Sequence, residues 1–259
     1  MGGTQAIRGG RNGHGGLGNV LSGIAVAVGF ALFLGGFVWG ALVYRPYTVP
    51  TDSMMPTVRP GDRVLAQRIG GGEVRRGDVV VFTDTDWSDL PMVKRVVGIG
   101  GDTVKCCGAA GELTVNGTPL DEPYIDDTRP DPGPAVPPGQ AAPGMPFEVT
   151  VPQGNLFLLG DRRDASLDSR SHLQEAGQGT VPRSAVSGRV DALAWPSAGM
   201  LERPETYEAL PGGVSRPGPL PLQVAAVAAG AVLVVLGAAY GPLVRVLGRE
   251  RRRERADAG

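Results

Sequence analysis

The stretch from residue 20 to residue 44 reads VLSGIAVAVGFALFLGGFVWGALVY and holds no charged residue in 25 positions. At ~1.5 Å per residue a helix of this length runs about 37 Å, which exceeds the ~30 Å hydrocarbon core of a bilayer. A second uncharged run of the same length covers residues 220–244. Both runs are longer than the usual buried helix of a soluble protein, so we expect two transmembrane helices.

The first run has another interpretation, a cleaved signal peptide. Its apolar part is too long for the central region of a signal peptide. The chain also continues into Tyr44-Arg45 without a small-residue cleavage pattern. An uncleaved membrane anchor therefore fits the sequence better.

Charge is distributed unevenly along the chain. Two arginines precede the first run, and six arginines with three acidic residues follow the second. Residues 45–219 hold 17 basic and 23 acidic residues, a net charge of −6. Because basic flanks stay on the cytoplasmic side, we expect both termini in the cytoplasm and the part between the runs outside it. Basic ends around an acidic middle argue against nucleic acid binding.

These features divide the chain into six parts. They are a disordered cytoplasmic tail, a transmembrane helix, an extracytoplasmic domain, a linker, a second transmembrane helix and a basic cytoplasmic tail. The predicted bounds are residues 1–19, 20–44, 45–200, 201–219, 220–244 and 245–259.

The extracytoplasmic domain is predicted to be mostly β. Its short β-branched runs are bounded by turn residues, as strands are. Asn116-Gly117 lies between two apolar runs and predicts a hairpin, because its tight turn needs φ > 0 at the centre. The expected strands cover residues 63–67, 79–82, 93–99, 147–151, 155–159 and 186–195, with the hairpin at 112–120.

The two cysteines, Cys106 and Cys107, are neighbours in the sequence. A disulfide between adjacent residues closes an uncommon eight-membered ring, so free thiols are the expected state. The pair lacks the spacing of a metal site, and only His172 of the two histidines lies in the outer domain. The sequence therefore predicts neither a metal site nor a cofactor.

A candidate nucleophile, Ser53, lies nine positions beyond Tyr44 in the run Pro50-Thr51-Asp52-Ser53-Met54-Met55-Pro56-Thr57. The two prolines fix φ on either side of the serine and favour an extended loop. A hydroxyl held in a stiff loop suits a nucleophile, although an ordinary serine in a proline-bounded loop has the same appearance.

Lys94 is the candidate base for such a serine. Strand alternation places Lys94 on the face opposite Val93 and Arg95, so one of two adjacent basic residues points inward or into a cleft. A solvated surface lysine is the alternative interpretation. An amine in apolar surroundings has a pKa lowered from ~10.4 toward neutrality, and it then accepts a proton from serine.

A third segment, residues 160–170, follows a strongly apolar strand. It brings acidic, basic and hydroxyl side chains into eleven residues. A charged surface turn is one interpretation, but the density of hydroxyls and alternating charges favours a hydrogen-bonded support loop at an active site.

Together and in this order, these segments resemble the type I signal peptidases, membrane-anchored Ser/Lys proteases that remove signal peptides from exported proteins. The resemblance covers residues 47–170 and a short strand near 186–195, and four motifs carry it. They are Ser53-Met-x-Pro-Thr57, Arg76-Gly-Asp-Val-Val-Val-Phe82, Lys94-Arg-Val-Val-Gly-x-x-Gly-Asp102 and Gly160-Asp-x-Arg-x-x-Ser-x-Asp-Ser-Arg170. The resemblance implies a mostly β fold: a coiled antiparallel β-sheet catalytic domain, at residues 45–200, flanked by two transmembrane helices.

The resemblance also implies roles for single residues. Ser53 matches the nucleophile, and Lys94 matches the general base, which must be neutral to accept the Ser53 proton. The Ser53 backbone N–H and the Thr51 hydroxyl match an oxyanion hole, in which one donor is worth ~3–4 kcal/mol. Ser166 matches the hydroxyl that orients the lysine amine. The other supporting positions are the ion pair Asp168 and Arg170, with Asp161 and Arg163 at the start of the same segment.

Substrate binding follows from the same resemblance. Val49, Pro50 and Val93 match positions that line shallow apolar pockets, which admit Ala and exclude larger side chains. The implied substrates are preproteins with an Ala-x-Ala-like site. They are bound as an added strand at the lipid surface of the bacterial plasma membrane, near the secretion translocon.

Three positions depart from the pattern of many relatives. Arg162 and Ala165 stand where asparagines are frequent, and Asp52 occupies a site that is often small. Arg162 and Ala165 lie in the support segment, so they affect fine positioning, and the Asp52 carboxylate beside the nucleophile bears on substrate preference.

Two other classes of protein share part of this pattern. One is a catalytically inactive membrane-anchored β-domain that binds export substrates, but this chain keeps both Ser53 and Lys94. The other is a self-cleaving Ser/Lys repressor, which is cytoplasmic and carries a DNA-binding helix pair. Two spans and an acidic outer domain argue against that class, so we expect a signal peptidase I.

Overall fold

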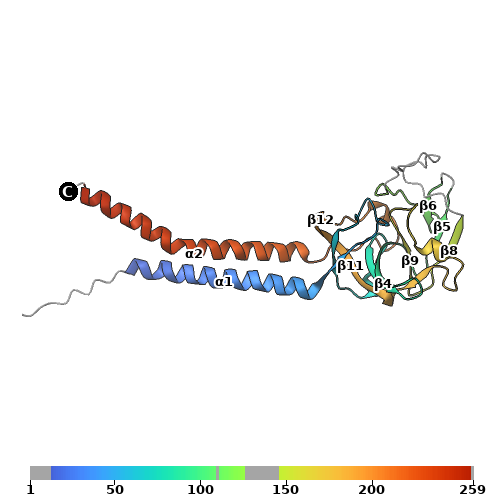
Figure 1. The fold of residues 1–259 in the computed structure, drawn as a ribbon, viewed down its shortest axis with the longest axis horizontal. Coiled ribbons are helices and arrows are strands. Elements are labelled where there is room, and N and C mark those ends of the chain that lie inside the picture. Colours follow the sequence, from blue (N-terminus) through green and yellow to red (C-terminus); the bar gives the residue numbers. More distant parts are fainter. Residues whose placement is uncertain (1–12, 109–110, 126–145, 258–259) are drawn as a thin grey trace, which may run out of the picture. The chain divides into compact units, whose positions relative to one another are not determined.

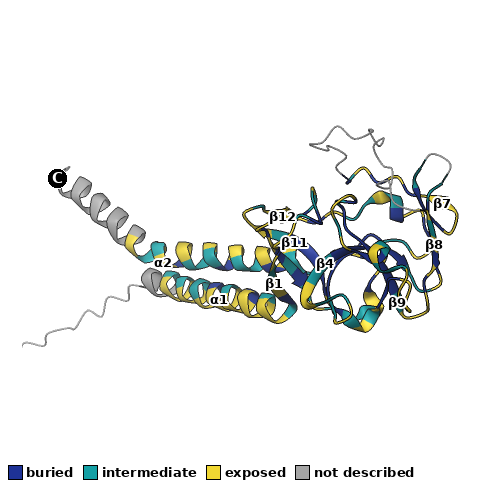
Figure 2. Cartoon of the chain, turned by 45° about the vertical axis from the view of Figure 1, so that its right-hand side comes forward, coloured by how far each residue is buried: buried dark blue, intermediate teal, exposed yellow. Residues whose placement is uncertain are grey.

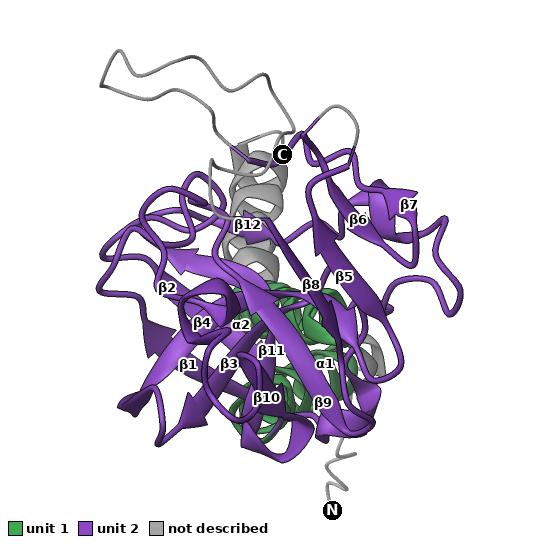
Figure 3. Cartoon of the chain, turned by 90° about the vertical axis from the view of Figure 1, so that its right-hand side faces the viewer, with its two compact units in different colours: residues 1–42, 219–259 green, residues 43–218 purple. Residues whose placement is uncertain are grey.

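The computed structural model describes residues 13–108, 111–125 and 146–257. The chain forms two compact units, residues 1–42 with 219–259 and residues 43–218 (Figures 1 and 3). The first unit contains two long helices, and the second contains the strands.

The first unit is a pair of apolar helices, α1 (Gly13–Val43) and α2 (Leu220–Asp257). The parts Gly18–Val43 and Leu220–Pro242 have mean hydropathies of 2.2 and 2.3 over lengths that suit a membrane. Large apolar residues on both helices are exposed, and Figure 2 colours exposed positions yellow along both helices. Helices with this much exposed apolar surface suit lipid rather than water, so both are candidate membrane spans.

Small residues line the contact between these two helices. An added Cβ on Gly29 would lie 2.8 Å from the carbonyl oxygen of Gly230. Ser22 Oγ donates a hydrogen bond of 2.6 Å to the Gly237 carbonyl. Glycines allow helix backbones to approach closely, and small or hydroxyl-bearing side chains are typical of helix contacts in membranes.

The second unit is built on an eight-stranded antiparallel sheet. The strand order is β1-β2-β11-β3-β4-β9-β10, with β12 paired to β11. The bounds are β1 Tyr44–Thr48, β2 Arg63–Gln67, β3 Val79–Asp84, β4 Ser88–Ile99, β9 Asn155–Leu159, β10 Thr180–Pro182, β11 Val186–Trp195 and β12 Gly199–Met200. The predicted class, mostly β and antiparallel with two flanking apolar helices, is confirmed.

A second antiparallel sheet lies between β4 and β9 in the sequence. Its order is β7-β6-β5-β8, with bounds β5 Thr103–Cys106, β6 Leu113–Val115, β7 Thr118–Pro119 and β8 Phe147–Thr150. Asn116 and Gly117 join β6 to β7 with φ of 54° and 79°, as the predicted hairpin turn requires. Short 3-10 helices cover Gly71–Glu73, Ser169–His172, Arg183–Ala185 and Glu205–Tyr207.

The main sheet is apolar on both faces at β3. Alternate side chains of Val79–Phe82 pack into two clusters, one around Met54 and one around Leu158. A strand buried on both faces has a continuous apolar sequence, which explains this run. A third cluster joins β5, β6 and β8 to β9, and it includes Tyr207. Figure 2 shows these strands as the dark blue interior of the unit.

Residues 201–218, expected as an extended linker, pack on this unit. We call them the C-terminal segment. Leu201, Tyr207 and Leu210 are buried. Arg203 forms an ion pair with Asp191, and it donates a 2.7 Å hydrogen bond to the Leu201 carbonyl. At the other end of the chain, α1 begins at Gly13, within the predicted tail, whose first 12 residues lie outside the described part.

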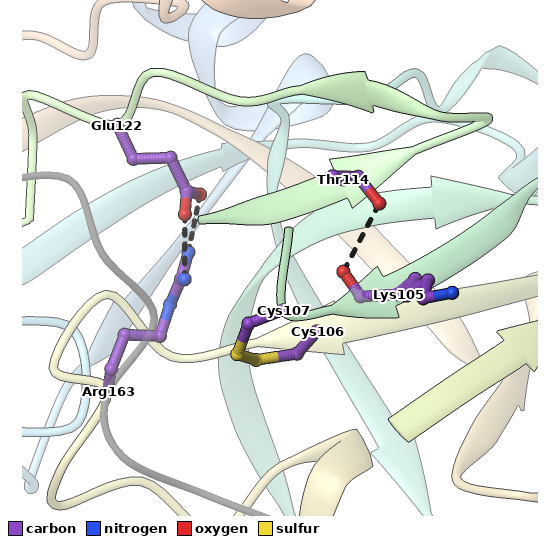
Figure 4. Close-up of a disulfide and its surroundings, with 6 residues drawn as sticks. All are labelled: Lys105, Cys106, Cys107, Thr114, Glu122 and Arg163. Carbon is purple, nitrogen blue, oxygen red and sulfur yellow. Dashed lines mark hydrogen bonds and ion pairs between the residues drawn. A yellow bond between two sulfur atoms is a disulfide. The ribbon is translucent and has the colours of Figure 1, made fainter. Parts of the chain in front are cut away.

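The cysteine prediction is wrong. The structure joins Cys106 and Cys107 in a disulfide, with their Cα atoms 2.9 Å apart (Figure 4). β5 ends at Cys106, so the alternation that points neighbouring strand side chains to opposite faces ends there too. The two sulfurs consequently meet, and Cys107 packs against the third cluster.

Candidate active site

Ser53 and Lys94, 41 positions apart, meet inside the second unit. Lys94 Nζ donates a 2.7 Å hydrogen bond to Ser53 Oγ. Ser53 is 7% exposed and Lys94 is 5% exposed. Ser53 lies in the turn that follows β1, next to the fully buried Met54, and Lys94 comes from the middle of β4. The two residues predicted as nucleophile and base are therefore in direct contact.

The environment of Lys94 favours the neutral amine. Burial lowers the pKa of Lys94 from its usual value to about 8, with Arg170 acting in the same direction. Asp168, Asp161 and Asp52 oppose this shift through their negative charges. Desolvation exceeds the attraction of three carboxylates, so a substantial neutral fraction is present near pH 8.

Thr51 belongs to the same loop as Ser53, and its side chain lies next to the Ser53 hydroxyl. Its Oγ1 is 3.3 Å from Ser53 Oγ. The Thr51 hydroxyl and the Ser53 backbone N–H thus belong to one short segment, as the predicted oxyanion hole needs.

The predicted support loop, Gly160–Arg170, contacts Ser53 through its backbone. Arg162 N–H donates a 3.0 Å hydrogen bond to the Ser53 carbonyl. A Cβ on Gly160 would lie 2.5 Å from the Ser53 carbonyl and 2.2 Å from Ser166 Oγ, so only glycine fits between them. Ser166 Oγ is buried without a hydrogen-bond partner among the described residues, and the predicted hydrogen bond to Lys94 is not formed.

Asp168 and Arg170 form the predicted ion pair. Arg170 Nε and Nη2 donate to the two Asp168 oxygens at 2.9 and 2.8 Å. The Gly160 N–H also donates to Asp168, at 3.0 Å. Asp168 is fully buried, and the hydrogen bonds and charge of Arg170 outweigh desolvation and lower the pKa of its carboxyl. This pair fixes both ends of the support loop beside Lys94.

Asp161 and Arg163 each pair with a residue that the sequence prediction did not include. Arg95 donates to Asp161 through Nε at 2.8 Å and Nη2 at 2.6 Å. Arg163 donates to Glu122 through Nη1 at 2.8 Å and Nη2 at 2.5 Å (Figure 4). A charged residue inside an apolar strand is the sequence signal for Arg95, whereas Glu122 lies in a proline-containing loop and carries none.

Two of the three predicted pocket residues share one apolar cluster. Val49 is buried and Val93 is half-buried, and both pack in the cluster around Met54. Pro50 is exposed. Among the described residues, no group of three His, Cys, Asp or Glu side chains is arranged to hold a metal ion.

Two of the family departures contact each other. Arg162 Nη1 forms an ion pair with Asp52, the residue before the nucleophile, and Arg162 Nε lies 3.7 Å from Asp164. The side chains are partly exposed, 29% for Arg162 and 44% for Asp52. The Arg162 guanidinium therefore stands at the rim of the site between two carboxylates.

The sequence of this chain is similar to those of known proteins. Residues 18–195 match the family described as "Signal peptidase, peptidase S26". The chain belongs to this family. A signal peptidase I of Mycobacterium tuberculosis (strain ATCC 25618 / H37Rv) is 32% identical over 202 residues, covering 62% of this chain and 68% of the relative. A signal peptidase I of Bacillus licheniformis is 33% identical over 175 residues, covering 67% of this chain and 86% of the relative.

A solved structure of a signal peptidase I from Enterococcus faecalis V583 is also similar. It is 27% identical, with 44% of this chain and 94% of the other covered and a TM-score of 0.35. The family match and the curated relatives together place this chain among the bacterial type I signal peptidases.

Proposed function

We propose that this chain is a membrane-bound signal peptidase I that cuts signal peptides from exported preproteins, with Ser53 as nucleophile and Lys94 as general base. The observation that carries the proposal is the 2.7 Å contact between Lys94 Nζ and Ser53 Oγ, with both residues buried. The lowered pKa of Lys94, about 8, supplies the neutral amine that the reaction needs. The names of the relatives support the class of substrate.

The reaction proceeds in two stages. Neutral Lys94 accepts the Ser53 proton while Oγ attacks the carbonyl carbon of the scissile bond. The Ser53 N–H and the Thr51 hydroxyl stabilise the oxyanion, and the Lys94 ammonium then protonates the leaving amine as the C–N bond breaks. Water, deprotonated by Lys94, attacks the acyl-enzyme ester. The serine leaves with its proton returned, and the signal peptide departs as a carboxylate.

The support loop is held by the charged side chains of Asp161, Arg163, Asp168 and Arg170. Ser166 lies in that loop, and its buried hydroxyl is available to form a hydrogen bond with the Lys94 amine during the reaction. The pockets that bind the small substrate side chains are lined by Val49, Pro50 and Val93. The arginine flanks favour an extracytoplasmic position for residues 45–219, with both termini in the cytoplasm. We infer that the site acts at the lipid surface of the bacterial plasma membrane, near the translocon.

The inactive β-domain is the remaining alternative. A domain that only binds export substrates gains nothing from a buried lysine aimed at a serine hydroxyl, because burying an amine without need is costly. The Ser53–Lys94 contact thus favours the enzyme.

Cleavage specificity tests the proposed function. The full-length protein in detergent micelles is expected to cut a preprotein once, after an Ala-x-Ala sequence, as N-terminal sequencing of the product shows. Replacing the Ala before the cut by Leu is expected to lower kcat/KM by about 10- to 200-fold, because the extra methylene groups do not fit the pocket. A Leu at the middle position serves as the control, since alternation in a bound strand points that side chain the other way. Equal rates for both altered substrates, or no cleavage at all, contradict the proposal.

The pH profile tests the role of Lys94. Because the active form is the neutral amine and its pKa is about 8, kcat/KM is expected to fall about tenfold per pH unit on the acid side. Asp52→Asn removes a charge that favours the ammonium, so the acid limb is expected to move to lower pH. Asp164→Asn is the control, since Asp164 also contacts Arg162 but is not one of the charges with the largest effects on the pKa of Lys94. A rate that stays flat down to pH 6 contradicts the assignment.

A further inference from the structure

The C-terminal segment lies beyond the part of the chain that matches the family, residues 18–195, yet it enters the core of the β-unit. Tyr207, on the 3-10 helix Glu205–Tyr207, is fully buried, and it packs in the third cluster with Phe157 and Leu113. Its ring occupies the space beside Gly77, where an added Cβ would lie 2.8 Å from the ring. The segment therefore supplies a side chain to the interior rather than only covering it.

The Tyr207 hydroxyl begins a chain of hydrogen bonds. It lies 2.9 Å from the Tyr124 hydroxyl, and Tyr124 donates in turn to Glu122 Oε1. A carboxylate only accepts, so Tyr124 uses its proton on Glu122 and Tyr207 donates to the Tyr124 oxygen. Burial raises the pKa of both phenols, so both keep the protons that these bonds require.

Glu122 connects this chain of hydrogen bonds to the support loop. It is fully buried, and both of its oxygens bind the Arg163 guanidinium (Figure 4). Arg163 Nε donates a 3.0 Å hydrogen bond to the carbonyl of Gly160, the residue pressed between Ser53 and Ser166. Arg170 also donates to the Arg163 carbonyl at 2.8 Å. Arg163 therefore fixes the loop at two points.

Tyr124 touches the second buried ion pair as well. The Arg95 guanidinium lies over its ring, 4.2 Å from the centroid, and Arg95 holds Asp161. Tyr124 is thus linked to both arginines that anchor the loop. Its hydroxyl reaches Arg163 indirectly, through Glu122, and its ring face contacts Arg95 directly.

We propose that Tyr207, Tyr124 and Glu122 are positioning residues for the reaction, which hold the Gly160–Arg170 loop against Ser53 and Lys94. The inference rests on the proposed peptidase function and extends it to the C-terminal segment. These side chains touch neither the substrate nor the reacting atoms. Losing one of them misplaces the loop and slows the chemical step without weakening substrate binding.

The test compares two buried tyrosine hydroxyls in the full-length enzyme. Tyr207→Phe keeps the ring and removes only the hydroxyl, and it is expected to lower kcat about 3- to 10-fold with KM within about twofold. Tyr44→Phe is the matched control, because the Tyr44 hydroxyl donates to Asp191 at 2.9 Å in a different buried network. It is expected to leave kcat unchanged. Tyr124→Phe breaks the same chain one step closer to the loop and is expected to reduce kcat at least as much as Tyr207→Phe.

The outcomes separate the inference from the function on which it rests. A wild-type protein that cleaves no preprotein overturns the proposed function and the inference with it. An active wild type with Tyr207→Phe and Tyr124→Phe both at wild-type kcat overturns the inference alone. Equal losses of kcat in Tyr44→Phe and Tyr207→Phe also overturn it, because the effect then belongs to any buried hydroxyl of the unit.

Discussion

Replacing Lys94 by Ala is expected to lower kcat for preprotein cleavage by at least about 10³-fold, with KM nearly unchanged. The 2.7 Å contact makes Lys94 the group positioned to accept the Ser53 proton. The Thr51 hydroxyl, 3.3 Å from Ser53 Oγ, is too weak a base to replace the lost amine. Ser53→Ala is expected to lose at least as much, because the covalent intermediate no longer forms.

A second substitution separates charge from basicity. Lys94→Arg keeps the positive charge, but a guanidinium does not deprotonate in proteins and cannot act as the base. We therefore expect it to be as inactive as Lys94→Ala. Lys105→Ala is the control, because Lys105 is 52% exposed and pairs with Glu148 at the surface. Folding of each variant is checked by its thermal transition. Cleavage by Lys94→Ala within tenfold of wild type contradicts the role proposed for Lys94.

The sequence predicted the strands whose residues alternate or are continuously apolar. β2, β9 and β11 have the predicted bounds. β1 was missed because it follows α1 directly and contains Pro46, which a sheet tolerates only at an edge, where β1 lies. β5 was missed because it is four residues long and ends in the cysteine pair, whose bonding the sequence also failed to predict.

The candidate site was predictable where a motif carried it. Ser53 and Lys94 sit in two short motifs, and their contact follows from the resemblance. Glu122 and Tyr207 carry no such signal. Glu122 lies in a loop beside Pro123, and Tyr207 lies in a short polar run between Pro204 and Pro211, so both look like surface residues. Their burial depends on partners far away in sequence. The Tyr207 hydroxyl, for example, contacts the hydroxyl of Tyr124, which lies 83 residues earlier in the chain. Such long-range polar contacts appear only when the fold brings the segments together.

Breaking the buried pair between Arg95 and Asp161 is the largest stability change that we expect. The two side chains are 1% and 0% exposed, and two hydrogen bonds join them. Asp161→Asn leaves the guanidinium buried without a counter-charge, which is expected to lower the free energy of unfolding by about 3–5 kcal/mol. Urea unfolding of the full-length protein in detergent, followed by tryptophan fluorescence, measures the change.

Two further variants decide whether the loss comes from an unpaired buried charge. Glu148→Gln breaks the Lys105–Glu148 pair, whose side chains are 52% and 58% exposed, and solvent screening keeps that cost below about 1 kcal/mol.

The double variant Arg95→Met with Asp161→Leu removes both charges and is expected to be more stable than Asp161→Asn alone, because no charge is then buried unpaired. Activity of the double variant is expected to stay low even where stability recovers, since Asp161 belongs to the support loop and accepts a 2.5 Å hydrogen bond from Thr57. If Asp161→Asn costs no more than Glu148→Gln, the pair does not anchor the loop. Recovered stability without recovered activity shows that Arg95 and Asp161 are kept for the geometry of the site.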